Sequence, residues 1–281
     1  MSTGESQTQG LGAPETTPAQ APASNDGPRR VCLLTGSAGK LGSAFCALYG
    51  DRYDIVAVYR RNRPWFASQD AGFIDPLAPG QPMEENRNRI FAIRADLSQP
   101  GECERVVDVA LSRFGRIDLL VNAAVDGGWA PMLGSDTLLR SGGALFATNV
   151  LIPLRLSTVV ARRFWQSRDD ENRWMGRNIV NVSSVAGLRM YVGSGQSLYA
   201  ASKAAMNSLT GHMAEEFRSV GVRVNATAPN SFPGHTAVER VAASIVTLDQ
   251  TPVNGTILVV DGDYEESIQM VPFNAPRPVP G

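Results

Sequence analysis

A tyrosine and a lysine four residues apart are the leading candidates for chemistry in this chain of 281 residues. They lie in the run Tyr199-Ala-Ala-Ser-Lys203, and residues four apart share one face of a helix. A free tyrosine has a pKa of about 10, so it is a poor base at neutral pH. A neighbouring ammonium stabilises the phenolate and lowers this pKa. The pair therefore predicts that Tyr199 transfers a proton near pH 7.

A glycine-rich segment, residues 35–42, follows an apolar run and precedes a helical pattern. Gly36 allows a tight turn, a second glycine lets the backbone approach a pyrophosphate, and Gly42 lets the helix pack on the strand. The start of the helix directs unpaired N–H groups and its positive dipole end toward phosphates. Three glycines could also form an ordinary loop. Because they stand between a strand and a helix, we predict a dinucleotide site.

The charge after the second predicted strand indicates which dinucleotide binds. NAD-binding folds place an acidic residue about 20 residues beyond the glycines, whereas an arginine accommodates the 2′-phosphate of NADP. This chain has Arg60 and Arg61 there, with no carboxylate before Asp70, and Lys40 lies in the glycine segment. The alternative is that the arginines are solvated residues at a strand end. Since a guanidinium binds a phosphate with paired hydrogen bonds, we predict NADP(H).

Strand and helix patterns alternate along the middle of the chain, which predicts an α/β fold. The alternation implies a doubly wound parallel sheet of the Rossmann type in a single domain, residues 30–271. Residues 1–29 are rich in Ser, Thr, Pro, Gly and Gln, so we predict a disordered tail, and 272–281 an irregular one. The predicted strands are 31–35, 55–59, 90–94, 119–121, 178–182, 223–226 and 257–260, and the predicted helices are 41–49, 103–114, 144–165, 198–220 and 237–248.

Three segments in order, residues 35–42, 181–187 (Asn-Val-Ser-Ser-Val-Ala-Gly) and 199–205 (Tyr-Ala-Ala-Ser-Lys-Ala-Ala), resemble the short-chain dehydrogenase/reductase family. The resemblance spans residues 30–262. Further matches are Ala95-Asp96-Leu97, Val121-Asn122-Ala123-Ala124, Asn149, Arg223-Val-Asn-Ala226 leading to Pro229, and Val260-Asp261-Gly262.

The resemblance implies roles for particular residues. Ser184 would hydrogen-bond the substrate oxygen, although Ser183 competes for this role. Tyr199 would transfer the proton, and Lys203 would hold the nicotinamide ribose and lower the pKa of the tyrosine. Asn149 would keep the shape of its helix and bind a water of the proton relay. The whole predicted cofactor site comprises Gly36, Ser37, Lys40, Leu41, Gly42, Arg60, Arg61, Asp96, Leu97, Asn122, Ala123, Tyr199, Lys203 and Pro229.

The chain departs from the classical branch of this family in its glycine pattern and in its substrate lid, among other places. The usual glycine pattern is TGxxxGxG, but Gly39 stands one residue early and Lys40 replaces the middle glycine, a spacing nearer to the extended branch. The substrate lid that family members insert after Pro229 is nearly absent. Loop 61–88, with Trp65 and Phe66, is a candidate replacement, and residues 126–129 form another candidate wall. Alternatively, these aromatic side chains pack on the body of the protein.

Composition excludes several classes of function. The formal net charge is -1 and no basic run is long, so we expect neither a nucleic-acid partner nor a membrane partner. No apolar run approaches the roughly 20 residues that span a bilayer. The three cysteines have no CxxC spacing and no nearby histidine, so we expect no metal site and a cytoplasmic setting.

Together these features predict an NADP(H)-dependent oxidoreductase. It would interconvert a carbonyl or imine and an alcohol or amine on a small or medium organic substrate, and we expect a homodimer or homotetramer. One alternative is a cofactor-binding redox sensor or scaffold with little turnover. Another is an epimerase- or dehydratase-like enzyme with a tightly held cofactor. The substrate itself is not readable from the sequence, because loops form the pocket walls in this fold.

Overall fold

The computed structural model describes residues 29–65, 69–70, 89–133, 136–192 and 195–270. Nearly all of both predicted tails and most of loop 61–88 lie outside these residues. The strands are β1 (Arg30–Thr35), β2 (Tyr53–Tyr59), β3 (Gln69–Asp70), β4 (Ile90–Arg94), β5 (Leu119–Asn122), β6 (Asn178–Val182), β7 (Arg223–Pro229), β8 (Thr256–Asp261) and β9 (Tyr264–Gln269). The α-helices are α1 (Lys40–Tyr49), α2 (Glu102–Phe114), α3 (Thr137–Phe146), α4 (Ile152–Val160), α5 (Asp169–Trp174), α6 (Ser197–Glu216) and α7 (Val238–Gln250).

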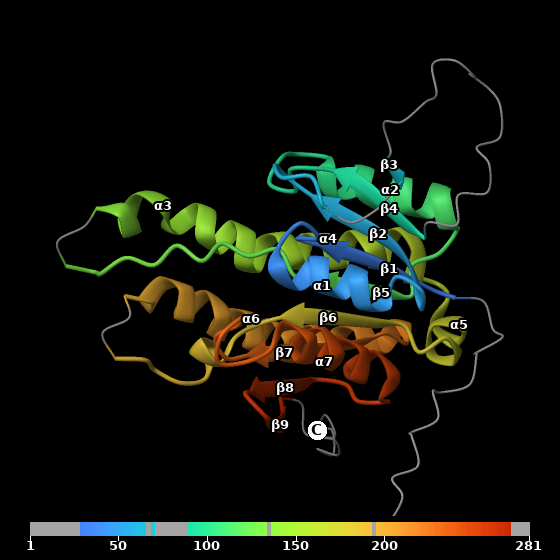
Figure 1. The fold of residues 1–281 in the computed structure, drawn as a ribbon. Coiled ribbons are helices and arrows are strands. Elements are labelled where there is room, and N and C mark those ends of the chain that lie inside the picture. Colours follow the sequence, from blue (N-terminus) through green and yellow to red (C-terminus); the bar gives the residue numbers. More distant parts are fainter. Residues whose placement is uncertain (1–28, 66–68, 71–88, 134–135, 193–194, 271–281) are drawn as a thin grey trace, which may run out of the picture.

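The strands form one sheet in the order β3-β4-β2-β1-β5-β6-β7-β8-β9 (Figure 1). Every neighbouring pair is parallel except β8 and β9, which are antiparallel. From β1, the chain first adds β2 and β4 on one side of the sheet and then adds β5, β6 and β7 on the other side. The strand order therefore changes direction at β1. In open α/β sheets, ligands bind at such a switch point, outside the carboxyl ends of the strands.

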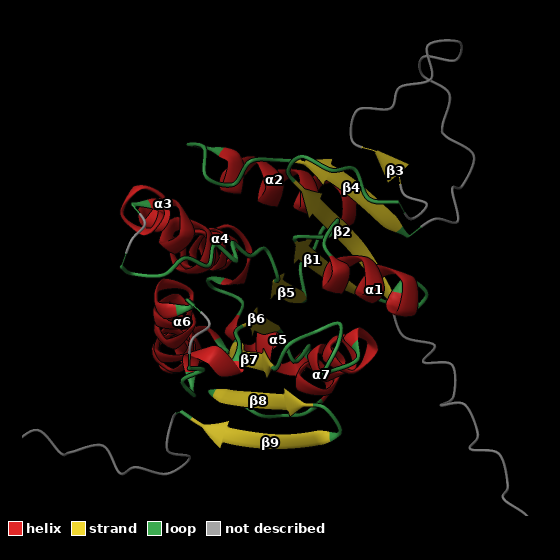
Figure 2. Cartoon of the chain, turned by 60° about the vertical axis from the view of Figure 1, so that its left-hand side comes forward, coloured by secondary structure: helices red, strands yellow, loops and turns green. Residues whose placement is uncertain are grey.

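Helices cover both faces of the sheet (Figure 2). Alternate residues of one strand point to opposite faces, so Leu33 of β1 packs with α2, α4 and α6, whereas Cys32 and Leu34 pack with α1 and α7. All three are fully buried. This two-sided burial explains why the strands have nearly continuous apolar sequences. The predicted doubly wound parallel fold is therefore confirmed.

The long helix that includes residues 140–165 consists of α3, the π-helical turn η1 (Ala147–Leu151), α4 and the π-helical turn η2 (Ala161–Trp165). By length and composition alone it could cross a membrane, which the sequence analysis did not anticipate. Half of its apolar window is buried within the protein. Leu156 and Val160 lie in the core beside the sheet, so this helix also has the burial of a core helix. The start of α3 projects beyond the carboxyl edge of the sheet (Figure 1).

Three elements were missed from the sequence: β3, α5 and β9. The edge strand β9 has the sequence YEESIQ and is almost entirely exposed, because it pairs with β8 on one side only. It therefore lacks the apolar run that indicates a central strand. Helix α5, with sequence DDENRW, has only six residues and buries Asn172 rather than an apolar stripe.

Candidate active site

A cavity of about 270 Å³ lies at the carboxyl ends of β1, β5 and β6. The glycine segment forms one side of it, through Gly36, Gly39 and the first residues of α1. Tyr199 and Lys203 of α6 form another side. The cavity thus brings together two segments that are far apart in the chain, and the sequence analysis assigns phosphate binding to one and proton transfer to the other. Seven of the predicted cofactor residues line it: Gly36, Lys40, Leu41, Gly42, Ala123, Tyr199 and Lys203.

Gly36 and Gly42 lie so close to neighbouring backbone atoms that neither position has room for a side chain. Gly36 has a φ of +69°, and a Cβ there would lie 2.8 Å from the carbonyl oxygen of Ala123. A Cβ on Gly42 would clash with the carbonyl oxygen of Gly36, so the helix could not pack on the turn. Gly39 lies at the N-terminal end of α1 with an extended backbone and lines the cavity. The loop therefore exposes backbone at the start of a helix, as a phosphate site requires.

Several predicted cofactor residues do not line the cavity but bond or pack with the segments around it. The Ser37 hydroxyl is fully buried and donates to the carbonyl oxygen of Val58 (3.0 Å). The Asn122 amide donates to Oδ1 of Asn181 (2.9 Å) and so ties β5 to β6. Leu97 is a core residue below α2. At the carboxyl end of β1, Thr35 Oγ1 accepts from the backbone N–H groups of Ala123 (3.0 Å) and Ala124 (3.1 Å).

Lys203 is wholly buried at the base of the cavity. Its Nζ donates to the carbonyl oxygen of Val182 (2.8 Å) and lies 5.7 Å from the centroid of the Tyr199 ring. Burial disfavours the charged form and lowers the pKa of Lys203 to about 8. Burial also raises the pKa of Tyr199, and a hydrogen bond with Ser184 opposes this rise only in part. Burial and the Ser184 hydrogen bond are the causes of this shift, and the lowering of the tyrosine pKa by Lys203 stays a prediction.

The structure distinguishes the two candidate serines. Ser184 begins the short helix η3 (Val185–Gly187), and its Oγ accepts from the N–H of Ala186 (3.2 Å) while contacting the Tyr199 hydroxyl. Ser183 is buried and donates to Oδ1 of Asn207 and to the carbonyl oxygen of Lys203 (3.2 Å). The hydroxyl beside Tyr199 is thus that of Ser184. This hydroxyl also donates to the carbonyl oxygen of Pro229 (3.4 Å).

Asn149 lies in the π-helical turn η1 and is buried. Its Oδ1 accepts from the N–H of Asp126 (2.8 Å), and its Nδ2 donates to the carbonyl oxygen of Asp126 (2.9 Å) and to Ser202 Oγ (3.0 Å). The amide therefore joins the segment after β5 to helix α6. This contact positions the wall that carries Trp129 relative to Tyr199.

The predicted 2′-phosphate residues lie at the carboxyl end of β2. Arg60 and Arg61 are exposed just beyond that strand, and Lys40 is exposed at the start of α1. The Ser37 N–H donates to the carbonyl oxygen of Val58 (3.1 Å), so the glycine loop abuts this strand end. Asp96 follows the neighbouring strand β4. The pKa of Asp96 is lowered mainly by a hydrogen bond from the Ser98 hydroxyl, and the positive charge of Arg60 also lowers it.

Aromatic side chains stand at the rim of the site. The Trp129 ring lies 6.3 Å from the Tyr199 ring at 60° and is 57% exposed. The predicted wall at residues 126–129 thus lies beside the candidate proton donor. Trp65 is 77% exposed, so it does not pack on the described body. Phe66 and most of loop 61–88 lie outside the described residues, and the lid role of that loop stays a prediction.

Phe232 was missed in the sequence analysis as a residue of the site. It lies three residues after Pro229, in the short connection to α7, and lines the cavity together with the glycine loop. A lone phenylalanine in an irregular segment carries no periodic signal. The packing of this segment against α1 and α7 brings Phe232 to the cavity.

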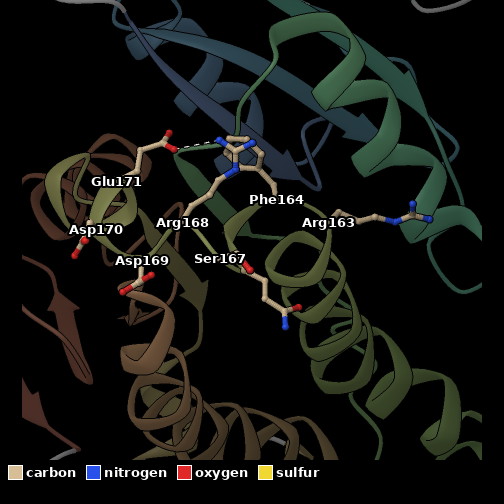
Figure 3. A pocket seen from close by; sticks show the side chains of 8 residues that line it. Arg163, Phe164, Ser167, Arg168, Asp169, Asp170 and Glu171 are labelled. Carbon is tan, nitrogen blue, oxygen red and sulfur yellow. Dashed lines mark hydrogen bonds and ion pairs between the residues drawn. The ribbon is translucent and has the colours of Figure 1, made fainter.

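A second hollow lies at the other edge of the sheet, near the start of β6 (Figure 3). It is lined by Arg163, Phe164 and residues 166–171. Arg168 pairs with Glu171 beside it (3.1 Å). It contains none of the predicted catalytic residues. In the part of the chain that the structure describes, no group of three or more His, Cys, Asp or Glu side chains could hold a metal ion.

Comparison with known proteins agrees with the geometry. The sequence model of the short chain dehydrogenase family matches residues 30–243. A sorbitol dehydrogenase of Cereibacter sphaeroides is 32% identical over 73% of this chain and 71% of its own, and a 3-oxoacyl-[acyl-carrier-protein] reductase of Synechocystis is 31% identical over 71% and 73%. The protein belongs to the short-chain dehydrogenase/reductase family.

A solved structure shows the same fold. An oxidoreductase of this family from Brucella ovis, in complex with a partially ordered NAD, superposes with a TM-score of 0.62 at 24% identity. The superposition covers 83% of this chain and all of the other. Membership makes the chain an oxidoreductase of a family that uses nicotinamide cofactors.

Proposed function

We propose that the protein is an NADP(H)-dependent oxidoreductase that interconverts a carbonyl or imine and an alcohol or amine on a small or medium organic molecule. One observation carries this proposal: Tyr199, with Ser184 at its hydroxyl and Lys203 beneath it, faces the glycine loop across one cavity. The names of relatives support the substrate class, since they include sorbitol dehydrogenase and a diacetyl reductase of Staphylococcus epidermidis, 29% identical over 71% of this chain.

The residues present fit a dinucleotide. The glycine loop leaves a cradle that a Cβ at Gly36 or Gly42 would fill, and α1 begins there with unpaired N–H groups. Gly36, Gly39 and Gly42 would hold the pyrophosphate, and Lys203 the nicotinamide ribose. When bound, the nicotinamide supplies or accepts the hydride at the substrate carbon.

The protein supplies the proton and positions the substrate. In the reductive direction, Ser184 Oγ would hydrogen-bond the carbonyl oxygen, and the Tyr199 hydroxyl would give its proton to that oxygen as the carbon gains a hydride. In the oxidative direction, the tyrosinate would accept the alcohol proton. A charged Lys203 stabilises that tyrosinate electrostatically. The apolar cover of Trp129 reduces the access of water to the reacting atoms.

Positive charge supports NADP(H) over NAD(H). Arg60 and Arg61 follow β2, where the ribose 2′ position is expected, and Lys40 opens α1. Asp96 is the nearby carboxylate, but its Oδ1 accepts from the backbone N–H (3.1 Å) and the hydroxyl (2.7 Å) of Ser98. It is therefore engaged locally rather than directed at a ribose.

We further propose a homodimer or homotetramer in the cytoplasm. Leu151 and Leu154 are exposed on the long helix that ends at Trp165, which supports a partner on that face. The buried, unpaired thiols of Cys32, Cys46 and Cys103 support a reducing compartment. Light scattering coupled to size exclusion tests the first proposal, and the location of a tagged protein tests the second.

The decisive experiment combines binding with turnover. Purified protein is titrated with NADPH and NADH, and then incubated with each cofactor and a panel of a vicinal diketone, a ketose, an aldehyde and a 3-oxoacyl thioester. Loss of nicotinamide absorbance with NADPH supports the proposal. Binding without turnover of any carbonyl or alcohol would favour a cofactor-binding sensor. Failure of both cofactors to bind contradicts the proposal.

A further inference from the structure

The connection between β7 and α7, residues 230–237, is short and has an internal hydrogen bond; we call it the β7–α7 loop. The Asn230 N–H donates to the carbonyl oxygen of Val260 (2.8 Å), and the Thr236 N–H donates to the carbonyl oxygen of Ser231 (3.0 Å). Thr236 is fully buried, and its Oγ1 accepts from the N–H of Gly262 (3.0 Å). The loop is thus tied at both ends to the end of β8.

Asp261, the last residue of β8, is the centre of these ties. Its Oδ1 accepts from Nδ2 of Asn230 (2.7 Å) and contacts Nε2 of His235 (2.7 Å). Its Oδ2 accepts from Arg189 (3.4 Å), which follows the Ser184 segment. These neighbours, led by Asn230, lower the pKa of Asp261, so it is ionised at neutral pH. One carboxylate therefore joins the β7–α7 loop, β8 and the segment after Ser184.

The contacts of Asp261 are unequal in strength. His235 is 58% exposed and Arg189 is 52% exposed, and ion pairs between exposed groups contribute little to stability. The bond with Asn230 is partly buried, and a hydrogen bond to an ionised acceptor is the stronger kind. Asn230 Oδ1 in turn accepts from the Tyr191 hydroxyl (3.3 Å) and the N–H of Ser231 (2.7 Å). The Asn230–Asp261 bond is thus the main anchor of the loop.

We propose that Asp261 is a positioning residue that anchors the β7–α7 loop, so that Phe232 forms a fixed wall of the cofactor cavity. Phe232 lines that cavity together with Tyr199 and the glycine loop. A mobile lid orders its residues when the ligand binds, at a cost in conformational entropy. A loop already held by side-chain and backbone bonds avoids this cost. The inference rests on the proposed function, since it assigns the wall to a nicotinamide cofactor.

The first test measures the loop in the protein without cofactor. Amide hydrogen exchange is followed over residues 230–236 in wild type, Asp261→Ala and Asp263→Ala. Asp263 is a matched control, since it lies two residues further along the same hairpin, is fully exposed and pairs with Arg240 instead. Asp261→Ala should raise exchange at least about tenfold in the loop, and Asp263→Ala should leave it unchanged. Unchanged exchange in Asp261→Ala overturns the proposal.

The second test measures NADPH affinity by calorimetry. Asp261→Ala and Phe232→Ala should each weaken binding roughly tenfold, and the double variant should bind no more weakly than Phe232→Ala alone. Such non-additivity shows that Asp261 acts through Phe232. His235→Ala should have a smaller effect than Asp261→Ala, and Asp261→Asn, which keeps an acceptor for Asn230, should recover part of the loss. Strictly additive losses, or equal losses in Asp263→Ala, contradict the proposal.

The two tests separate this inference from the proposed function. If wild type binds neither NADPH nor NADH, the proposed function fails, and the exchange experiment still decides whether Asp261 anchors the loop. If wild type binds NADPH and Asp261→Ala binds it equally well, the proposed function stands and the assigned role of Asp261 is wrong. Melting temperatures identify any variant that is unfolded. If Asp261→Ala is unfolded, both measurements are made on Asp261→Asn and His235→Ala instead.

Discussion

The ammonium nitrogen of Lys203 donates to the carbonyl oxygen of Val182 (2.8 Å) and stands 5.7 Å from the centre of the Tyr199 ring. The only lysine of α6 is therefore buried against backbone, beside the candidate proton donor rather than in solvent. Burial disfavours the charged ammonium and lowers the pKa of Lys203 to about 8. The arrangement has consequences for stability as well as for catalysis.

We expect Lys203→Met to raise stability at neutral pH while damaging activity. The folded-state pKa lies below that of an unfolded lysine, so the unfolded chain binds more protons between about pH 8 and the usual lysine range. The penalty is present in full below about pH 8 and disappears as the pH rises through that window. The gain should reach about 3 kcal/mol at most. Denaturant unfolding at neutral and alkaline pH measures it, and a gain that does not shrink at high pH would contradict the assignment.

Replacing Tyr199 by Phe should abolish most turnover and leave cofactor binding nearly intact, because only the hydroxyl that carries the proton is lost. Removal of an acid–base group commonly costs about 10²–10⁴ in rate. Steady-state kinetics with NADPH and calorimetry measure the two effects. Tyr264→Phe is the control, since this tyrosine is exposed on the edge strand β9. Wild-type turnover in Tyr199→Phe would assign the proton to another group.

The two adjacent serines should separate chemistry from stability. Ser184→Ala removes the hydroxyl that contacts Tyr199, so kcat should fall with little change in melting temperature. Ser183→Ala leaves buried acceptors on α6 without a donor, which costs about 1–3 kcal/mol of stability. Kinetics and thermal melts of the pair measure both. The reverse pattern would place Ser183 at the substrate.

Arginines after β2 should set the cofactor preference. Arg60→Ala and Arg61→Ala, singly or together, should weaken NADPH binding by about tenfold or more and leave NADH binding unchanged, because only NADPH carries the 2′-phosphate. NADH is thus an internal control in each titration. Equal affinity of wild type for both cofactors at moderate salt contradicts the assignment.

Trp129 should affect kinetics where a distant tryptophan does not. Trp129→Ala removes the ring beside Tyr199, so KM for the substrate should rise or kcat fall. Trp174→Ala is the matched control, since this 84% exposed ring lies on α5, near the opposite edge of the sheet. Neither change should lower the melting temperature much, because both rings are largely exposed. Equal kinetics in the two variants would remove Trp129 from the site.

Local pattern was sufficient for most of the architecture. Strands β4 and β6 match their predicted bounds, and β1, β2 and β5 differ by two residues or fewer at each end. Their side chains are buried on both faces, so each strand is an unbroken apolar run that stands out along the chain. The glycine loop and the Tyr199–Lys203 spacing were equally readable, because a tight turn or a shared helix face restricts residues close in sequence.

Long-range contacts decided the rest. The choice between Ser183 and Ser184, the direction of the Tyr199 pKa shift and the place of Phe232 in the cavity all depend on which segments meet at the sheet edge. The edge strand β9 and the ties of Asp261 were also invisible in local pattern, since exposed polar residues carry no periodic signal. Burial and hydrogen-bond partners arise only when distant segments pack, so these features belong to the tertiary structure.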